Sequence, residues 1–339
     1  MTSTHFQIGN QSVQCYFNAS FSNIDQWVPS HQCIFITDEN IAYAHPAAFA
    51  HKQTIVLKAG ESTKQQQTID YIISKLIEKE ADRDTWLIGV GGGVITDITG
   101  YVAGIFMRGL KTGLIPTSLL GMVDAAIGGK NGIGVGTYKN LVGLIKQPEF
   151  ILFDPHWLTT LPTREWSNGF AEIIKHACIR DVDMLEELLN HSIEWYQNNP
   201  KELATLIEKN VRLKWSIVAN DPWEQNERRL LNFGHTIGHA IENTYQLSHG
   251  EAIAIGMMYA VKLSAATNGL EETSIQIMEK AFTQYQLPTQ AMIDWRKIAP
   301  LIQLDKKRKG ETIRFIVLEE IGKGKVQEIS LETIQTILF

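Results

Sequence analysis

The stretch Asn232-Phe-Gly-His-Thr-Ile-Gly-His239 constrains this chain more than any other, because it places two histidines four residues apart. On a helix, residues at this spacing lie about 40° apart around the axis, so both imidazole rings point the same way. A third histidine, His249, follows in Ser-His-Gly-Glu. Neutral imidazole is the commonest transition-metal ligand, so the cluster suggests a metal site. A buried, hydrogen-bonded histidine pair is the alternative, and the spacing does not decide between the two.

Length, charge and cysteine content exclude several classes of protein. At 339 residues the chain exceeds the size at which one hydrophobic core stops growing, which favours two domains. A net charge of -6 argues against general binding of nucleic acid or membrane surfaces. The three cysteines are widely spaced and fit a reducing cytoplasm, without a disulfide framework. We see no signal-peptide pattern and no apolar run long enough for a membrane span, so we expect a cytoplasmic protein.

The first half of the chain alternates between apolar runs and polar turns. Alternating residues in 1–20, compact runs at 32–37, 52–57, 85–90 and 112–116, and an amphipathic pattern at 65–80 predict strands around one helix. Strand, turn, helix and strand in this order are typical of a parallel α/β sheet. Ligands bind such sheets at the carboxyl ends of the strands, where the polar tails of these runs fall.

The Gly91-Gly92-Gly93 turn lies between an apolar strand and a predicted helix. Three glycines there let the backbone approach a pyrophosphate, whose charge favours a helix N-terminus. The turn lacks the full dinucleotide-binding fingerprint, so a tight strand-to-helix turn without a ligand is the alternative.

Residues 117–147 are glycine-rich and predict a loop, in which Lys130 and Lys139 suit an anion such as phosphate. A solvated surface loop is the alternative there.

The character of the sequence changes near residue 154, where a linker is predicted. Helical patterns follow at 168–190, 202–219, 229–245, 250–267 and 273–285, and the runs 312–318 and 325–330 predict a terminal hairpin. Glu172, Lys175 and His176 share one face of the first of these helices. The charge run at 305–309 is typical of a solvated loop, from which one lysine could reach a site. We therefore predict domains at 1–154 and 155–339.

Many short motifs in one order carry a family resemblance. They are Gly60-Glu61-x-x-Lys64, Gly91-Gly-Gly-x-x-x-Asp97, Arg108-Gly109, Pro116-Thr-Ser-Leu-Leu, Val123-Asp124, Gly128-Gly-Lys130, Lys139-Asn140, Thr160-Leu-Pro-x-Arg-Glu, Ala171-Glu172-x-x-Lys175, Arg228-x-x-Leu-Asn232-x-Gly-His235-Thr-x-Gly-His239-Ala, His249-Gly-Glu-Ala and Asp305-Lys306-Lys307. From Thr37 to about Leu318 the chain resembles the 3-dehydroquinate synthase family of sugar phosphate cyclases. Any one motif alone would be a weak signal, but the set in this order is specific.

The resemblance implies an α/β protein with an N-terminal Rossmann-like domain (1–154) and a mostly helical, metal- and substrate-binding C-terminal domain (155–339), with the active site in the cleft between them. It also implies a homodimer, NAD, and zinc or cobalt. The implied metal ligands are Glu172, His235 and His249. His239 then becomes a neighbour on the same helix face that contacts substrate, which the histidine spacing could not have told.

The resemblance also implies the remaining site residues. Those implied to contact NAD are Asp38, Asn40, Glu61, Lys64, Gly91, Gly92, Gly93, Asp97, Thr117, Ser118, Lys130, Lys139, Leu158 and Thr160. Those implied for catalysis and substrate binding are Arg108, Asp124, Lys130, Lys139, Asn140, Lys175, Lys214, Arg228, Asn232, His239 and Lys306. Their cations suit a phosphate and a carboxylate, so an acidic protein can bind an anionic substrate where positive charge is local.

The implied activity is that of a phosphate-eliminating lyase in the shikimate pathway of aromatic amino-acid biosynthesis. Its substrate is 3-deoxy-D-arabino-heptulosonate 7-phosphate, and its products are 3-dehydroquinate and phosphate. The implied steps are oxidation, β-elimination of phosphate, reduction, ring opening and aldol closure, with no net redox change. The protein supplies position and electrostatics, and the cofactor supplies the hydride chemistry.

A few positions depart from the usual pattern of the family. The same residues also bear on four alternative functions. The departures are Gly134, the pair Ala125-Ala126, and Pro222 with Asn226, and none is a proposed ligand or cation. Valiolone-type and deoxy-inosose synthases share the metal and NAD sites, but Lys214, Arg228, Asn232 and Lys306 favour the heptulosonate. The cations argue against an iron-type alcohol dehydrogenase. The helix lacks the glutamate of a His-Glu-x-x-His protease, and no site residue is degraded as in an inactive scaffold.

Overall fold

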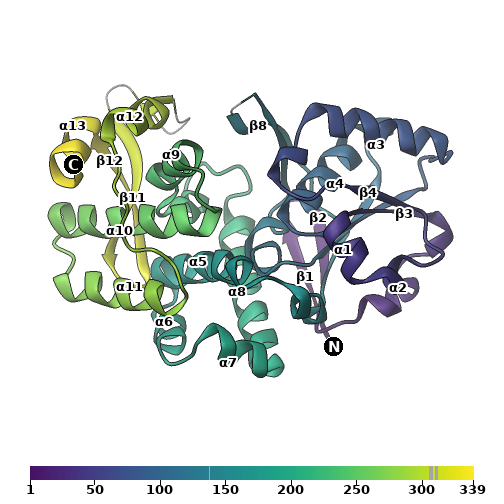
Figure 1. Cartoon of the computed structure of the whole chain (residues 1–339), viewed down its shortest axis with the longest axis horizontal. Coiled ribbons are helices and arrows are strands. Elements are labelled where there is room, and N and C mark those ends of the chain that lie inside the picture. The colour runs from purple at the N-terminus through teal and green to yellow at the C-terminus, as the bar shows by residue number, and fades with distance from the viewer. Residues whose placement is uncertain (137, 305–307, 310–311) are drawn as a thin grey trace. The chain divides into compact units, whose positions relative to one another are not determined.

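A computed structural model describes residues 1–136, 138–304, 308–309 and 312–339, and the chain forms two compact units (Figure 1). Unit 1 combines Met1–Pro162 with Pro200–Pro222. Unit 2 combines Thr163–Asn199 with Trp223–Phe339. The predicted α/β class, with a parallel sheet in the N-terminal part and helices in the C-terminal part, is confirmed. The division into functional domains at residues 154 and 155 stays a prediction.

A seven-stranded sheet is the centre of unit 1, in the order β1-β2-β9-β6-β5-β3-β4. Its strands are β1 (Thr2–Ile8), β2 (Gln11–Phe17), β3 (Cys33–Asp38), β4 (Thr54–Leu57), β5 (Trp86–Gly91), β6 (Lys111–Pro116) and β9 (Phe150–Phe153). All neighbouring pairs are parallel except the β1–β2 hairpin. The strands expected from the apolar runs are therefore confirmed. The sequence analysis missed β9 because this run of four residues adjoins the predicted linker.

Helices cover the parallel strands of unit 1. They are α1 (Glu39–Ala44), α2 (Pro46–Phe49), α3 (Gln66–Glu78) and α4 (Gly93–Ile105), with the short 3-10 helices η1 (Phe21–Gln26), η2 (Ser30–Gln32), η3 (Glu61–Thr63), η4 (Phe106–Arg108) and η6 (Pro155–Thr160). Ile69, Ile72 and Leu76 repeat at helical spacing on α3 and are fully buried against the sheet. This core fixes where the loops at the carboxyl ends of the strands lie.

Helix α8 (Pro200–Asn220) belongs to unit 1 although it follows helices of unit 2 in the sequence. Trp215 of α8 stacks on Phe6 of β1, with ring centroids 5.0 Å apart, and Trp215 is fully buried. Burial of such a large aromatic surface is one of the strongest stabilising contributions available to a helix. The sheet therefore holds α8, and α8 in turn brings Lys214 to unit 1.

Residues 117–147 do not form the glycine-rich loop predicted from the sequence. They contain the π-helix η5 (Gly121–Ala125) and an antiparallel hairpin of β7 (Lys130–Val135) and β8 (Tyr138–Ile145). Glycines on both strands, such as Gly132 paired with Gly143, interrupted the apolar alternation by which strands are recognised in a sequence. The backbone hydrogen bonds between β7 and β8 stabilise the hairpin although its local sequence pattern is weak.

Unit 2 is mostly helical. Its helices are α5 (Thr163–Arg180), α6 (Val182–Leu189), α7 (Ile193–Asn198), α9 (His235–Tyr245), α10 (His249–Asn268), α11 (Glu272–Gln284), α12 (Trp295–Leu304) and α13 (Leu331–Leu338), with the 3-10 helix η7 (Glu227–Asn232). Its strands are β10 (Arg308–Lys309), β11 (Thr312–Glu320) and β12 (Lys323–Ser330). The predicted terminal hairpin is confirmed as β11 and β12, which pair antiparallel.

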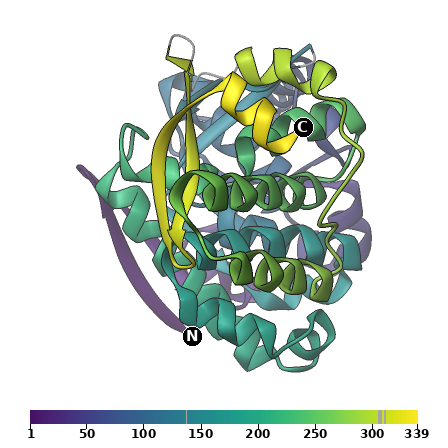
Figure 2. The same ribbon diagram turned by 90° about the vertical axis from the view of Figure 1, so that its left-hand side faces the viewer.

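Helix α10 is the central element of unit 2. Its residues are buried on almost every side from Gly250 to Ser264, which is expected of a helix that is apolar all round. The long strands β11 and β12 run crosswise to it in Figure 2, and the hydroxyl of Ser264 accepts a hydrogen bond of 2.9 Å from the backbone nitrogen of Leu318. This burial fixes the direction in which α10 begins, and therefore where His249 lies.

The single helix predicted over 229–245 is divided in the structure. The 3-10 helix η7 ends at Asn232, and α9 begins at His235 after Gly234, whose φ of 77° is left-handed. Residues other than glycine pay a steric cost there, so Gly234 ends one helix and starts the next. His235 is thereby the first residue of α9 rather than a residue in the middle of a longer helix.

Close backbone packing joins α9 to α10. A side chain at Gly256 of α10 would overlap the carbonyl oxygen of Gly234, and one at Gly238 would press on Ile253 and on the carbonyl of Ala252. Only glycine allows two helices to approach this closely. None of the helices in the described parts of the chain combines the length and apolar character needed to span a bilayer.

The substitution Gly256→Ala tests this packing. The added methyl group must displace backbone rather than a flexible side chain, so we expect a loss of about 1–3 kcal/mol in the free energy of unfolding, measured with denaturant. Lys262→Ala on the exposed side of the same helix is the control and should change it by less than about 0.5 kcal/mol. Equal stability of the two variants would contradict the close approach.

Candidate active site

Glu172 lies in the middle of α5 and is fully buried. A buried carboxylate is costly unless it is paired. Lys175, one turn later on the same helix and only 1% exposed, donates a short hydrogen bond to Glu172 Oε2. The two carboxylate oxygens of Glu172 therefore have different partners. Oε2 binds Lys175 of the same helix, and Oε1 faces helices that pack against α5.

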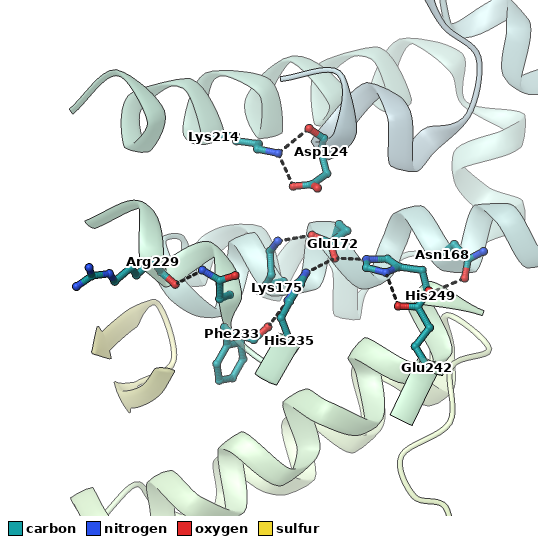
Figure 3. Close-up of polar contacts among 12 residues, drawn as sticks. Asp124, Asn168, Glu172, Lys175, Lys214, Arg229, Phe233, His235, Glu242 and His249 are labelled. Atoms are coloured by element: carbon teal, nitrogen blue, oxygen red, sulfur yellow. Dashed lines mark hydrogen bonds and ion pairs between the residues drawn. The ribbon is translucent and has the colours of Figure 1, made fainter. Parts of the chain in front are cut away.

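His235 and His249 approach that second oxygen from two other helices. His235 Nε2 on α9 lies 3.5 Å from Glu172 Oε1, and His249 Nε2 on α10 lies 3.2 Å from the same atom. Figure 3 shows both rings directed at Glu172. The three possible ligand atoms all lie within 4.8 Å of one another. The structure therefore brings together the three residues for which the family resemblance implies metal binding.

The start of α10 is fixed in place by three contacts to its own residues and to α5. Ser248 and Glu251 form a reciprocal capping box, and Glu251 also pairs with Arg164 of α5 at 2.7 Å. The nitrogen of Gly250 donates to Asn168 Oδ1 at 2.9 Å. A side chain at Gly250 would overlap the backbone of Asn168. These contacts hold His249, the first residue of α10, against the helix that carries Glu172.

The surroundings shift the pKa values of the two histidines in opposite directions. Burial and the nearby Lys175 ammonium lower the pKa of His235 well below its ordinary value, and Glu172 opposes this shift only in part. Burial also acts to lower the pKa of His249, but the carboxylates of Glu172 and Glu242 outweigh it and raise the pKa to about 10. In the metal-free protein at neutral pH, His235 is therefore neutral and His249 carries a proton on each nitrogen.

A second group of ligand-type atoms shares His249. It consists of His239, Glu242 and His249, again within 4.8 Å. The ring of His239 lies 5.0 Å from that of His235, so the two rings are neighbours on one face of α9, as predicted. This group is more exposed than the first one. The buried Glu172 group is the stronger candidate, because a metal ion gains most where water competes least.

Other predicted residues of unit 2 lie in η7. Arg228 of η7 is buried, with 2% exposure. Asn232, the last residue of η7, donates through Nδ2 to Glu224 and, at 3.2 Å, to the backbone oxygen of Arg229. Glu224, which lies between the departures Pro222 and Asn226, was not singled out from the sequence, yet it orients a predicted substrate residue. Residues 305–307, and with them Lys306, lie outside the described residues.

The glycine turn and its neighbours lie at the carboxyl ends of β5 and β6 in unit 1. Gly91 ends β5, Gly92 precedes α4 and Gly93 begins it. The backbone nitrogen of Thr117, just after β6, donates to the oxygen of Gly91 at 3.0 Å. Ser118 Oγ lies opposite Gly92 and accepts from the nitrogen of Gly121 at 3.1 Å. A helix N-terminus beside a strand end in a parallel sheet is typical of a site for a pyrophosphate.

A buried ion pair supports the same edge of the sheet. Lys64 donates to Asp97, which lies one turn into α4, and their side chains are 6% and 17% exposed. Burial raises the pKa of Asp97, although the ammonium of Lys64 pulls it down. Two residues predicted for NAD thus contact each other directly. Because the pair lies next to the glycine turn, it also fixes the orientation of α4.

The remaining residues predicted for NAD lie on other loops of this unit. Asp38 caps α1 by accepting from the nitrogens of Asn40 and Ile41 at 3.0 and 3.1 Å. Burial raises the pKa of Asp38, and these hydrogen bonds offset the shift in part. Asn40 and Glu61 are exposed. In η6, Leu158 is buried, and Thr160 Oγ1 lies 3.0 Å from His45 Nε2.

Asp124 and Lys214 form the clearest contact between predicted substrate residues of unit 1. Lys214 Nζ on α8 donates to both the carboxylate and the backbone oxygen of Asp124 in η5, each at 2.6 Å (Figure 3). The lysine side chain is 8% exposed and that of Asp124 is 23% exposed. The contact directs a cation to one defined position, which a flexible surface lysine would not occupy.

The other predicted cations of unit 1 lie in different segments. Arg108 is exposed in η4, beyond the last turn of α4. Lys130 pairs with Ile145 at one end of the β7–β8 hairpin, whereas Lys139 lies near the other, about 20 Å away along β8. Joint binding of one phosphate by Lys130 and Lys139 stays a prediction. Asn140, next to Lys139, adopts a positive φ of 52°.

Comparison with known proteins identifies the family. The model of the 3-dehydroquinate synthase N-terminal region matches residues 54–168, and that of the C-terminal region matches 169–308. The chain is 41% identical over 292 residues to a 3-dehydroquinate synthase of Methylacidiphilum infernorum, covering 84% of this chain and 80% of that one. The chain belongs to the 3-dehydroquinate synthase family. The resemblance predicted from the motifs is confirmed.

Two solved structures share the fold. A 2-deoxy-scyllo-inosose synthase in complex with carbaglucose-6-phosphate, NAD+ and Co2+ is 25% identical, with a TM-score of 0.87 over 99% of each chain. A 2-epi-5-epi-valiolone synthase of Streptomyces hygroscopicus subsp. jinggangensis, with NAD+ and Zn2+ bound, is 24% identical, with a TM-score of 0.89 over 98% of this chain and 97% of that one. Both belong to the classes weighed as alternatives, so the fold alone does not select the substrate.

Glu242 and Asn168 were not predicted from the sequence. Glu242 contacts His249, and Asn168 binds the backbone next to it. A signal for Glu242 was present in the spacing, because residues 235, 239 and 242 fall on one face of a helix. No comparable signal exists for Asn168, because its partner lies 82 positions away in the sequence.

Metal uptake should release a proton from His249. Its pKa of about 10 in the metal-free protein means that Nε2 carries a proton at pH 7, and a metal ion must displace that proton. We expect zinc affinity to rise about tenfold per pH unit between pH 6 and 8. Calorimetry in buffers of different ionisation enthalpy would measure about one proton released per zinc ion. Uptake without proton release would contradict the assigned protonation state.

Proposed function

We propose that this protein catalyses the conversion of 3-deoxy-D-arabino-heptulosonate 7-phosphate to 3-dehydroquinate and phosphate, with NAD and a zinc or cobalt ion. The reaction is a phosphate-eliminating lyase step of the shikimate pathway. The observation that carries the proposal is the convergence of Glu172, His235 and His249 in a chain that belongs to the 3-dehydroquinate synthase family. We also propose a cytoplasmic homodimer, following the family resemblance.

The residues of this cluster fit a catalytic zinc or cobalt ion. Two imidazole nitrogens and one carboxylate oxygen are donors that both metals accept, and three protein ligands leave coordination positions for substrate oxygens. Lys175 neutralises the carboxylate oxygen that faces away from the histidines. When bound, the metal ion would polarise a substrate hydroxyl, and NAD would accept and later return a hydride.

The glycine turn and its neighbours fit the pyrophosphate and riboses of NAD. Backbone nitrogens at the start of α4 donate to phosphate oxygens, and Gly92 leaves room for close approach beside Ser118. The carboxylates of Asp38, the last residue of β3, and of Glu61, in the turn after β4, suit ribose hydroxyls. The Lys64–Asp97 pair keeps α4 aligned with the turn, so these residues position the cofactor and do not take part in hydride transfer.

Cations and amides from several segments suit the anionic substrate. Lys214, held by Asp124, presents a fixed ammonium group, and Arg228 presents a buried guanidinium group with paired donors. Asn232, oriented by Glu224, suits a substrate hydroxyl or phosphate oxygen. His239 lies beside His235 of the metal cluster and suits proton transfer to or from the substrate. Charge-assisted hydrogen bonds of this kind are worth about 1.5–3 kcal/mol each.

A related sugar phosphate cyclase activity is the second candidate, because the two similar structures act on other substrates. The identity of 41% to a 3-dehydroquinate synthase favours the heptulosonate over those substrates. The candidates separate in a direct comparison of two sugar phosphates, one with the carboxylate and one without it. Turnover of glucose 6-phosphate in preference to the heptulosonate phosphate would select the second candidate.

The first assay measures phosphate release from the heptulosonate phosphate with NAD and zinc. We expect stoichiometric phosphate and dehydroquinate, with no accumulation of NADH in its ultraviolet absorbance, because the cofactor is regenerated within each turnover. Exhaustive chelation should abolish the activity, and added zinc should restore it. NADH formed in proportion to substrate would instead identify a dehydrogenase, and full activity after chelation would refute the metal requirement.

Lys130→Ala tests the predicted anion contact at the base of the β7–β8 hairpin. The side chain is exposed, so the fold should persist, and the loss of a charge-assisted contact should lower kcat/KM about 10- to 100-fold. Lys201→Ala, an exposed lysine on α8, is the matched control and should leave kcat/KM unchanged. Identical kinetics for the two variants would remove Lys130 from the site.

A further inference from the structure

Glu242 lies two turns after His235 on α9, and its side chain is 11% exposed. Its carboxylate lies beside His249 of the neighbouring helix, with Glu242 Oε2 3.5 Å from His249 Nδ1. Figure 3 shows the His249 ring between Glu172 on one side and Glu242 on the other. The two carboxylates thus occupy the two different nitrogens of one imidazole.

The two histidines of the candidate metal cluster are held through Nδ1 by different kinds of group. His235 Nδ1 lies 3.0 Å from the backbone oxygen of Phe233, so its partner is part of the main chain. His249 Nδ1 has a side-chain partner, Glu242. A histidine that binds a metal ion almost always donates its other N–H to such an acceptor, which fixes the tautomer and the ring orientation.

His249 needs this support more than His235 does. It is the first residue of α10, and its side chain is 27% exposed against 10% for His235. The packing that holds α10 fixes the backbone of His249, but the ring can still rotate about its own side-chain bonds. A hydrogen bond from Nδ1 to Glu242 keeps Nε2 directed at Glu172. The carboxylate also adds negative charge next to a divalent ion.

We propose that Glu242 is the positioning residue of His249, which holds the ring with Nε2 directed at the metal ion and makes Nδ1 the protonated nitrogen. The inference deepens the proposed function and rests on its metal site. Glu242 does not bind the metal ion in this account. Its effect therefore falls on metal affinity and on ligand geometry before it falls on chemistry.

The test compares Glu242→Ala and Glu242→Gln in the full-length protein. Zinc affinity is measured by competition with a chromophoric chelator, and geometry is measured from the visible absorption of the cobalt-loaded protein. We expect Glu242→Ala to weaken zinc binding about 10- to 100-fold and to change the cobalt spectrum. Glutamine keeps an oxygen that accepts from Nδ1, so Glu242→Gln should recover most of the affinity. Excess zinc should restore turnover in both variants.

Two controls separate positioning from folding. Glu279→Gln removes an exposed carboxylate from α11 of the same unit and should leave zinc affinity and the cobalt spectrum unchanged. The thermal unfolding midpoint of each metal-free variant shows whether its fold persists. Glu242→Gln is nearly isosteric with the native residue, so it remains informative even where Glu242→Ala does not fold.

Three outcomes would overturn the proposal. Zinc affinity within twofold of the wild type in a folded Glu242→Ala variant would mean that Glu242 does not position His249. A Glu242→Gln variant as weak as Glu242→Ala would assign the effect to charge alone. A loss as complete as that of His249→Ala would make Glu242 a ligand. If the wild-type protein itself binds no zinc, the metal site of the proposed function fails, which is distinguishable from all three.

Discussion

The burial of one carboxylate, Glu172, is the constraint on which the candidate metal site depends. An ionised group with no exposure to water is tolerated only when each oxygen has a partner, and removing one partner of such a pair costs about 3–5 kcal/mol. Lys175 of the same helix satisfies one oxygen, whereas His235 and His249 face the other from two further helices. The helices α5, α9 and α10 must therefore lie close together, and Gly234, Gly238 and Gly256 permit it.

Unit 1 also contains carboxylates that are stabilised by pairing with lysines. A buried pair, Lys64 with Asp97, and a lysine held by a carboxylate, Lys214 with Asp124, place charge at defined positions next to the ends of parallel strands. In each pair the carboxylate balances the ammonium charge, so both groups can be largely buried while the ammonium group stays at a fixed position. The two members of each pair come from segments far apart in the sequence, and the packing of the fold brings them into contact.

Local patterns predicted the sheet and most helices, because apolar periodicity is a property of neighbouring residues. The three ligand-type residues came from the family resemblance that the short motifs carry, because histidine spacing alone did not select them. The hairpin at 130–145 was missed because glycines dilute its alternation, and the break at Gly234 was missed because helical spacing continues across it. Asn168 acts through a contact between helices, which no local pattern records. Glu242 shares a helix face with His235 and His239, but its partner His249 lies on another helix. The spread of Lys130 and Lys139 along one hairpin was likewise invisible before the strand register was known.

The central claim is that one metal ion binds where α5, α9 and α10 meet, and X-ray absorption at the zinc edge of the zinc-loaded protein tests it most directly. The account predicts one zinc ion per chain, with two imidazole nitrogens at about 2.0–2.1 Å and a carboxylate oxygen at about 2.0–2.2 Å. The signal of one imidazole should disappear in His235→Ala. A sulfur ligand, or an unchanged spectrum in that variant, would contradict the account.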